Sequence, residues 1–300
     1  MAYNCIVLVK QVPDTAHITG QAMKEDGTVN RAALPAIFNP EDLNALEMAL
    51  QVRDQHGGSV TVITMGPPRA ADILREALTR GADRVILLTD RRTAGSDTLA
   101  TSYALACAVR KAGQPTGLPD LVFCGRQAID GDTAQVGPQV AEKLGLPQIT
   151  YAEAILALTG SEIVVRRAFP LGQETVRCTL PCLLTVVGTA NHPRPPSVRR
   201  SAATKLAAIP QEIPTLLARW PEFGSEEALS RYLDQRGLKI TVWNADDIGA
   251  EADRVGLEGS PTKVLKVDYV VLGGFESREF EPSPEGMSAL VRELAREYII

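Results

Sequence analysis

Hydrophobic residues follow two alternating periods along the first half of the chain. Short apolar runs rich in Val, Ile and Leu are typical of parallel strands buried on both faces. They lie near residues 4–10, 59–65, 84–89 and 120–124. Segments with helical spacing lie between and after them, near residues 41–55, 69–80, 98–112 and 134–144. Strands that alternate with helices predict an α/β fold with a doubly wound, mostly parallel sheet.

The pattern changes after Gly145. Four strand-like runs then follow one another without helices between them, so we expect antiparallel strands added to the parallel sheet. They lie near residues 148–158, 162–169, 173–179 and 182–187, with turn signals at Thr159-Gly160 and Leu171-Gly172. Within the first half, residues 18–36 interrupt the alternation, and Asp26-Gly27 predicts a small hairpin there.

Prolines interrupt the segment from Gly188 to Pro214. The run 191–196 can neither continue a strand nor begin a helix, because proline lacks a donor and restricts its neighbours. A structureless stretch of this length needs a purpose, and we expect an extended arm that packs on another chain. Two amphipathic helices are predicted after it, near residues 225–236 and 283–298.

Composition narrows the class of partner. Of 300 residues, 45% are hydrophobic and 22% are charged, and the net charge is −5 without a long basic run. This balance is that of an ordinary folded protein and argues against nucleic acid as a partner. We find neither a signal-peptide pattern nor the ~18 apolar residues of a membrane span, so we expect no membrane insertion and a cytoplasmic location. Five cysteines without metal-ligand spacing and three histidines in polar loops argue against a metal site.

In an open parallel sheet, ligands bind beyond the carboxyl ends of the strands, beside helix N-termini. The first loop of interest holds Asn39, Pro40 and Asp42. These residues suit an N-cap, the first helical turn and a capping box, so either a well-made helix start or a ligand contact explains them. The second loop, Met65-Gly66-Pro67, is either an ordinary tight turn or a place where a ligand approaches the backbone closely.

Small and hydroxyl-bearing residues crowd the third loop, 94–102, at the start of a predicted helix. Thr98 and Thr101 lie three apart and share a helix face, which suits a phosphate or a ribityl chain. Asp97 would repel phosphate, so we predict that it caps the helix instead. A purely structural helix start is the alternative.

The fourth loop, 124–138, carries three glycines, two acids, an arginine and two amides, more than a bare turn requires. Arg126 offers a planar donor fork, Asp130 and Asp132 can accept from ribose hydroxyls or cap the next helix, and backbone amides can hold a pyrophosphate. We therefore predict a nucleotide site here. Its residues are Gly125, Arg126, Gln127, Ala128, Ile129, Asp130, Gly131, Asp132, Thr133, Ala134, Gln135 and Val136. Neither a dinucleotide fingerprint nor a hydrolase motif occurs, which favours a cofactor carrier without catalytic side chains.

Three segments together resemble the beta subunit of electron-transfer flavoproteins. They are the fourth loop, the helix start at Asn39-Pro40, and residues 165–181, a charged strand, a Gly-x-Glu turn and a strand ending in Leu-Pro. The resemblance runs from residue 1 to about residue 205. It implies an adenine-nucleotide alpha hydrolase-like fold and a heterodimer whose alpha subunit carries FAD. It also implies nucleotide contacts at Leu8 and at residues 39–42, 65–67 and 126–136.

The same resemblance divides the chain and suggests a docking residue. Residues 1–187 correspond to the nucleotide- or flavin-binding domain, and residues 188–300 to an arm and helices that pack on the alpha subunit. Members of the family dock acyl-CoA dehydrogenases through an exposed aliphatic residue. Val198 lies at the matching place, where Leu is more familiar.

The cofactor depends on the branch of the family. Ordinary beta subunits hold structural AMP, whereas those of the electron-bifurcating branch hold FAD that accepts a hydride from NADH. Residues 95–103, 131–138 and 256–262 are similar to the bifurcating branch. We therefore expect FAD, tuned by Arg126, with ferredoxin or flavodoxin as low-potential acceptor; AMP is the alternative. A nucleotide-binding sensor without redox work is a third hypothesis, and the Pro-rich arm and added strands count against it.

Overall fold

The computed structural model describes residues 1–14, 35–115, 117–170, 172–263, 278–297 and 299. The predicted hairpin around Asp26-Gly27, the turn residue Leu171 and His17 lie outside these residues. His56 was expected in a polar loop and is instead the last residue of a helix, with its ring edge-on to Tyr3 at 5.5 Å.

The predicted alternation of strands and helices in the first half is confirmed. The strands are β1 (Tyr3–Val9), β4 (Gly58–Met65), β5 (Arg84–Leu88) and β6 (Leu121–Gly125). The helices are α1 (Pro40–His56), α2 (Ala71–Arg80), α3 (Thr98–Gly113) and α4 (Val136–Leu144). Two short strands, β2 (Gln11–Pro13) and β3 (Ala36–Phe38), pair antiparallel outside the main sheet.

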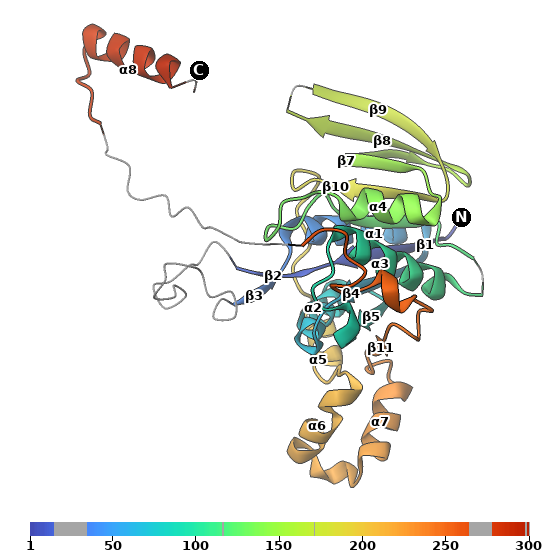
Figure 1. Ribbon diagram of the computed structural model, residues 1–300. Coiled ribbons are helices and arrows are strands. Elements are labelled where there is room, and N and C mark those ends of the chain that lie inside the picture. Colours follow the sequence, from blue (N-terminus) through green and yellow to red (C-terminus); the bar gives the residue numbers. More distant parts are fainter. Residues whose placement is uncertain (15–34, 116, 171, 264–277, 298, 300) are drawn as a thin grey trace.

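The main sheet has nine strands in the order β11-β5-β4-β1-β6-β10-β7-β8-β9 (Figure 1). The four strands that follow α4 in sequence are β7 (Gln148–Leu158), β8 (Glu162–Phe169), β9 (Gly172–Thr179) and β10 (Cys182–Val186). The predicted antiparallel addition is right for β7–β8 and β8–β9 but wrong for β10, which is parallel to both β6 and β7. All five residues of β10 are buried, as an internal parallel strand requires.

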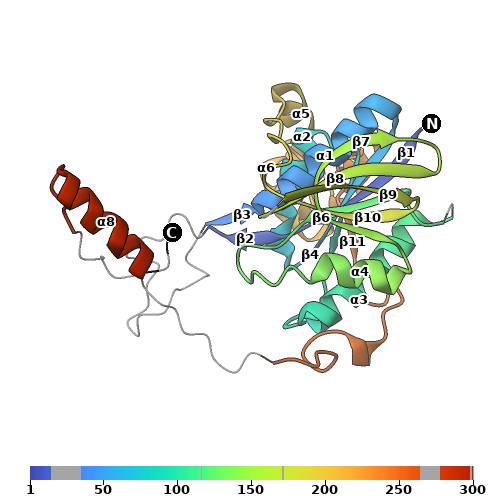
Figure 2. The same cartoon turned by 90° about the horizontal axis from the view of Figure 1, so that it is seen from above.

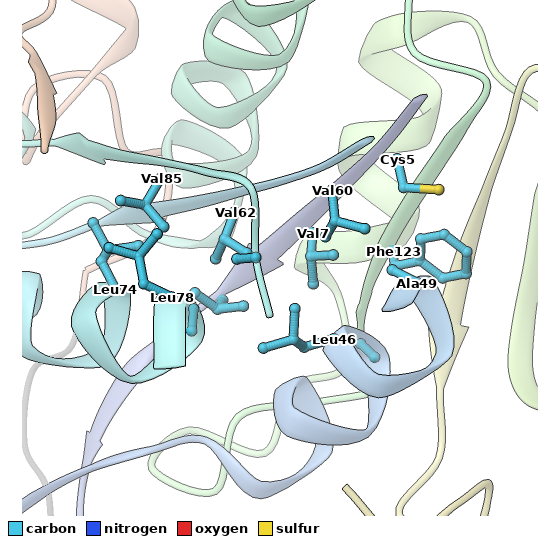
Figure 3. Close-up of a cluster of buried hydrophobic side chains, with 14 of the residues drawn as sticks. Cys5, Val7, Leu46, Ala49, Val60, Val62, Leu74, Leu78, Val85 and Phe123 are labelled. Carbon is cyan, nitrogen blue, oxygen red and sulfur yellow. The ribbon is translucent and has the colours of Figure 1, made fainter. Parts of the chain in front are cut away.

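Helices cover both faces of the sheet, so the doubly wound architecture is confirmed (Figure 2). On one face, Leu46 of α1 and Leu74 of α2 pack on Val60 and Val62 of β4 (Figure 3). On the other face, residues of α3 and α4 pack against Ile6, Leu8 and Ile63. The sheet therefore holds its carboxyl edge rigidly between two cores, and the loops that leave this edge start from fixed points.

The segment after Val187 is more structured than predicted. It contains α5 (Val198–Thr204), α6 (Ile213–Arg219), α7 (Glu226–Gln235), β11 (Thr241–Trp243) and α8 (Pro284–Arg296). The helices near residues 225–236 and 283–298 are confirmed. The structureless stretch 188–214 is right for residues 188–197, which form neither helix nor strand, but wrong from Val198 on, where α5 begins directly after the prolines. Ser197 caps it by accepting a hydrogen bond from the Arg200 N–H. β11 pairs with β5, so the sheet includes a strand from this segment. Within the described ranges, no helix combines the length and apolar character that crossing a membrane requires.

Candidate functional site

The loops singled out from the sequence leave the same edge of the sheet. In the parallel register, Val9 lies opposite Thr64, Leu8 opposite Cys124, and Met65 opposite Leu88. The carboxyl ends of β1, β4, β5 and β6 are therefore neighbours, as the nucleotide-site prediction requires.

Asn39 is fully buried and ties the first loop to the fourth. Its side-chain N–H donates to the Gln127 carbonyl at 2.9 Å, and its side-chain oxygen accepts from the Ile129 N–H at 3.1 Å. It occupies the N-cap position of α1 as predicted, but its side chain makes no cap hydrogen bond. The helix-start interpretation is thus incomplete, because the amide is used to hold the neighbouring loop.

Asp42 is a buried carboxylate that joins three elements. It accepts hydrogen bonds from the Lys10 N–H at 2.8 Å and the Gly125 N–H at 2.9 Å. A Cβ atom on Gly125 would lie 2.5 Å from Asp42 Oδ1, so only glycine allows this approach. Burial raises the pKa of Asp42 to about 7, although the two backbone donors oppose that shift. The capping box predicted for this acid does not form.

Ion pairs fix the start of the fourth loop. Lys10 Nζ lies 2.7 Å from Asp130 Oδ1, and Arg126 Nη2 lies 3.0 Å from Glu41 Oε1. Glu41 also accepts a hydrogen bond from the Gln127 N–H at 3.0 Å. The positive charge of Arg126, expected to face a flavin or phosphate, is therefore shared with a carboxylate of α1.

The later part of the fourth loop holds a strained backbone. Asp132 and Ala134 have φ values of 52° and 53°, in the left-handed region that residues with a Cβ seldom adopt. Such strain is most often found at functional sites. The loop then enters α4, whose N-cap residue Gln135 makes no side-chain cap hydrogen bond, so its side chain offers no acceptor to the first N–H groups of the helix.

The third loop is capped as predicted and is joined to the fourth. The Asp97 side chain accepts from the Ala100 N–H at 2.9 Å, which confirms Asp97 as the N-cap of α3. Thr98 Oγ1 donates to Gln135 Oε1 at 3.0 Å, and Ser102 Oγ donates to Gln139 Oε1 at 3.2 Å. The start of α3 and the start of α4 therefore lie side by side.

Burial separates the predicted site residues into two groups. Leu8, Asn39, Asp42 and Gly125 are buried, so a ligand could meet Leu8 only through its backbone, and the other three are engaged in holding loops. The remaining predicted residues are half-buried or exposed and open to contact. They are Pro40, Met65, Gly66, Pro67, Asp97, Thr98, Thr101, Arg126, Gln127, Ala128, Ile129, Asp130, Gly131, Asp132, Thr133, Ala134, Gln135 and Val136.

The second loop has a weaker connection to the others. Gln11 Nε2 donates to the Arg69 carbonyl just beyond it at 3.2 Å. One residue before Met65, the hydroxyl of Thr64 is buried and has no hydrogen-bond partner among the described residues. A buried hydroxyl without a hydrogen-bond partner lowers the free energy of unfolding, so Thr64 is an unsatisfied polar group at the carboxyl end of β4.

A cavity of about 380 Å³ lies beside the site rather than among the four loops. It is bounded by residues of β3, α1 and α2, and of the predicted contacts only Pro40 lines it. Across the described parts of the chain, no cluster of three or more His, Cys, Asp or Glu side chains is arranged to hold a metal ion. Burial raises the pKa of the Cys124 thiol, so this group at the end of β6 stays protonated and is a poor nucleophile.

The donor set fits a nucleotide better than it fits catalysis by side chains. Hydroxyls of Thr98 and Thr101 and backbone N–H groups at the start of α4 suit phosphate, and the exposed carboxylate of Asp132 and the half-buried, ion-paired one of Asp130 suit ribose. Glu41 lies within the predicted contacts 39–42, but its ion pair with Arg126 was not predicted, and Lys10, which follows β1 at the carboxyl edge, was missed as a partner of the fourth loop. The sequence did not predict that residues 256–262 contact the third loop.

Comparison with known proteins places the chain in a family. Residues 26–212 match the family model described as the electron transfer flavoprotein domain. "Protein FixA" of Azorhizobium caulinodans is 47% identical over 267 residues, which cover 88% of this chain and 83% of FixA. The "Electron transfer flavoprotein subunit beta" of Clostridium acetobutylicum is 40% identical over 297 residues, covering 99% of this chain and 100% of that protein. The protein of the same description from Megasphaera elsdenii is 42% identical over 265 residues, covering 87% and 86%. The chain belongs to the electron transfer flavoprotein beta subunit family.

Proposed function

We propose that this chain pairs with an electron transfer flavoprotein alpha subunit and binds FAD at the carboxyl edge of its sheet for electron bifurcation. The name of the Clostridium acetobutylicum relative, a subunit beta, supports a partner subunit. When bound, the FAD would supply the redox chemistry, taking a hydride from NADH and passing one electron to ferredoxin or flavodoxin and one to the alpha-subunit FAD. The protein's own residues bind and orient it.

The hydrogen bond between Thr98 and Gln135 is the observation that most supports FAD rather than AMP as the ligand. It joins the hydroxyl-rich start of α3 to the fourth loop at 3.0 Å, so the polar surface extends beyond one loop. The fourth loop offers groups for one phosphate and a ribose. The start of α3 adds hydroxyls for a second phosphate and a ribityl chain, groups that FAD has and AMP lacks.

The proposal also assigns a docking residue for an acyl-CoA dehydrogenase-type flavoenzyme. Val198 is the first residue of α5 and is 86% exposed, more than any other Val, Leu or Ile side chain among the described residues. An exposed aliphatic residue at a helix start can enter an apolar pocket of a partner without rearrangement of this chain.

Nucleotide analysis of the purified heterodimer tests the proposal. Denaturation should release two FAD per heterodimer, and addition of NADH to the native complex should bleach the flavin absorbance. One FAD and one AMP per heterodimer, without bleaching, would overturn bifurcation and leave a non-bifurcating carrier with structural AMP. A stable homodimer that carries ATP and no flavin would instead favour the nucleotide-binding sensor.

A further inference from the structure

Residues 256–262 form hydrogen bonds with the loop that leads into α3, about 160 positions earlier in the chain. The Gly256 N–H donates to Ser96 Oγ at 2.9 Å, and the Asp97 N–H donates to Ser260 Oγ at 2.8 Å. Asp97 Oδ2 accepts from the Thr262 N–H at 3.0 Å and from Thr262 Oγ1 at 2.6 Å. Both carboxylate oxygens of Asp97 are therefore occupied, one by α3 and one by Thr262.

Close packing shows that this contact is built for a fixed geometry. Ser260 is buried, and its hydroxyl donates to the Gly256 carbonyl at 2.5 Å. A Cβ atom on Gly95 would lie 2.7 Å from Leu257, and one on Gly256 would lie 2.1 Å from the Arg92 carbonyl oxygen. Gly256 thus approaches the backbone of the other segment where only glycine leaves room, and the φ of 74° at Gly95 also favours glycine.

A second set of contacts holds the preceding residues against the body of α3. The Glu251 N–H donates to the Tyr103 hydroxyl at 3.1 Å, and the Arg254 guanidinium lies 3.9 Å from the centre of the Tyr103 ring. The segment therefore follows α3 for more than one turn, and the hydrogen bonds at Asp97 are not an isolated contact.

We propose that residues 256–262 form a clasp that fits the start of α3 to an anionic dinucleotide, with Ser260 and Thr262 as positioning residues. This inference rests on the proposed function, because it concerns the flavin half of the same site. Asp97 stands beside the hydroxyls assigned to the second phosphate, where its negative charge would oppose binding. Two donors from Thr262 hold that carboxylate in place and offset part of its charge. They also hold the backbone that positions Thr98.

The test is binding of FAD by the heterodimer stripped of its beta-subunit nucleotide, with Thr262→Val against Thr262→Ser. Val keeps the shape and the N–H but loses the hydroxyl, so the dissociation constant for FAD should rise about tenfold, as expected for loss of one hydrogen bond to a charged group. Ser keeps the hydroxyl and should bind as the wild type does. AMP, which lacks the flavin half, should bind all three proteins alike.

Thr159→Val is the matched control, since Thr159 also donates a hydroxyl hydrogen bond, to the Glu162 carbonyl in the turn between β7 and β8. Hydrogen exchange gives a readout other than affinity: FAD should slow exchange in residues 97–100 and 256–262 of the wild type, and less so with Ser260→Ala.

Two results separate the failures. If the wild type binds FAD but Thr262→Val binds it equally well and FAD leaves exchange in the clasp unchanged, the inference is overturned and the proposed function stands. If the wild type binds AMP and not FAD, the proposed function fails and the inference fails with it.

Discussion

At the residue scale, Asp42 shows why a side chain that fits a local motif can serve a distant one. Its spacing from Asn39 fits a capping box, yet its carboxylate accepts from Lys10 and Gly125, which lie 32 and 83 positions away. The local motif and the tertiary contact require the same residue type. Sequence alone could find the polar residues at the carboxyl edge, but not which partners they use.

Asp42 should make the stability of the protein depend on pH. Burial raises its pKa from 3.8 to about 7, so between these values the folded chain holds a proton that the unfolded chain has lost. Stability from this group is therefore complete below about pH 4 and is lost as pH rises to about 7, at about 1.4 kcal/mol per pKa unit. Asp42→Asn cannot ionise and should remove this slope, measured by urea unfolding at several pH values. Parallel curves for the two proteins would show that Asp42 is ionised throughout.

The protein should be more stable with glycine in place of Ala134. Its φ of 53° lies where a Cβ is strained, and glycine adopts this region freely. Ala134→Gly should raise the free energy of unfolding by about 0.5–1 kcal/mol, after the entropy that glycine loses on folding is subtracted. Ala141→Gly, inside α4, is the control and should lower it by about 1 kcal/mol or more. A destabilised Ala134→Gly would contradict the strain argument.

At the scale of elements, the sequence predicted the first half of the fold well and the second half in part. Strands buried on both faces and helices with one apolar stripe each leave a recognisable spacing of hydrophobic residues in the sequence. For this reason β1, β4, β5 and β6 could be located. β10 follows β9 without an intervening helix, a pattern that predicts an antiparallel strand. Its place between β6 and β7 depends on how the β8–β9 hairpin folds outward, which no local pattern records.

The Pro-rich segment before α5 is attached to this chain's own helices. Arg194 Nε lies 2.7 Å from Glu47 Oε2 of α1, and the Ser197 N–H donates to the Thr79 carbonyl of α2 at 2.9 Å. Prolines here precede a helix rather than prevent one. Packing of the segment on a partner chain stays a prediction.

Substitution of Arg194 should show how much this attachment contributes to the free energy of unfolding. The Glu47 side chain is 7% exposed, so Arg194→Met would leave a buried carboxylate without its cation. The expected loss in the free energy of unfolding is about 3 kcal/mol, measured by urea denaturation. Glu47→Gln combined with Arg194→Met should lose less than the two single changes added together. Additive losses would mean that the pair contributes no coupling energy.

At the scale of the whole molecule, the candidate nucleotide site and the candidate docking residue belong to different parts of the structure. The nucleotide loops lie at the carboxyl edge of the sheet, whereas Val198 begins α5, which contacts α2. Separate sites allow the two roles to be changed one at a time.

Val198→Asp should therefore impair transfer of electrons with an acyl-CoA dehydrogenase-type partner without changing the nucleotide content of the heterodimer. A charge in an apolar pocket of the partner is costly to bury, so the apparent affinity between the two proteins should fall about tenfold or more. Val198→Leu is the matched control, because it keeps an aliphatic side chain and should transfer electrons at least as well as the wild type. Titration of the reduced dehydrogenase with each heterodimer, followed by flavin absorbance, gives the affinity. Equal affinities for Val198→Asp and Val198→Leu would show that docking occurs elsewhere, since an 86% exposed side chain at a helix start cannot act through the core of its own chain.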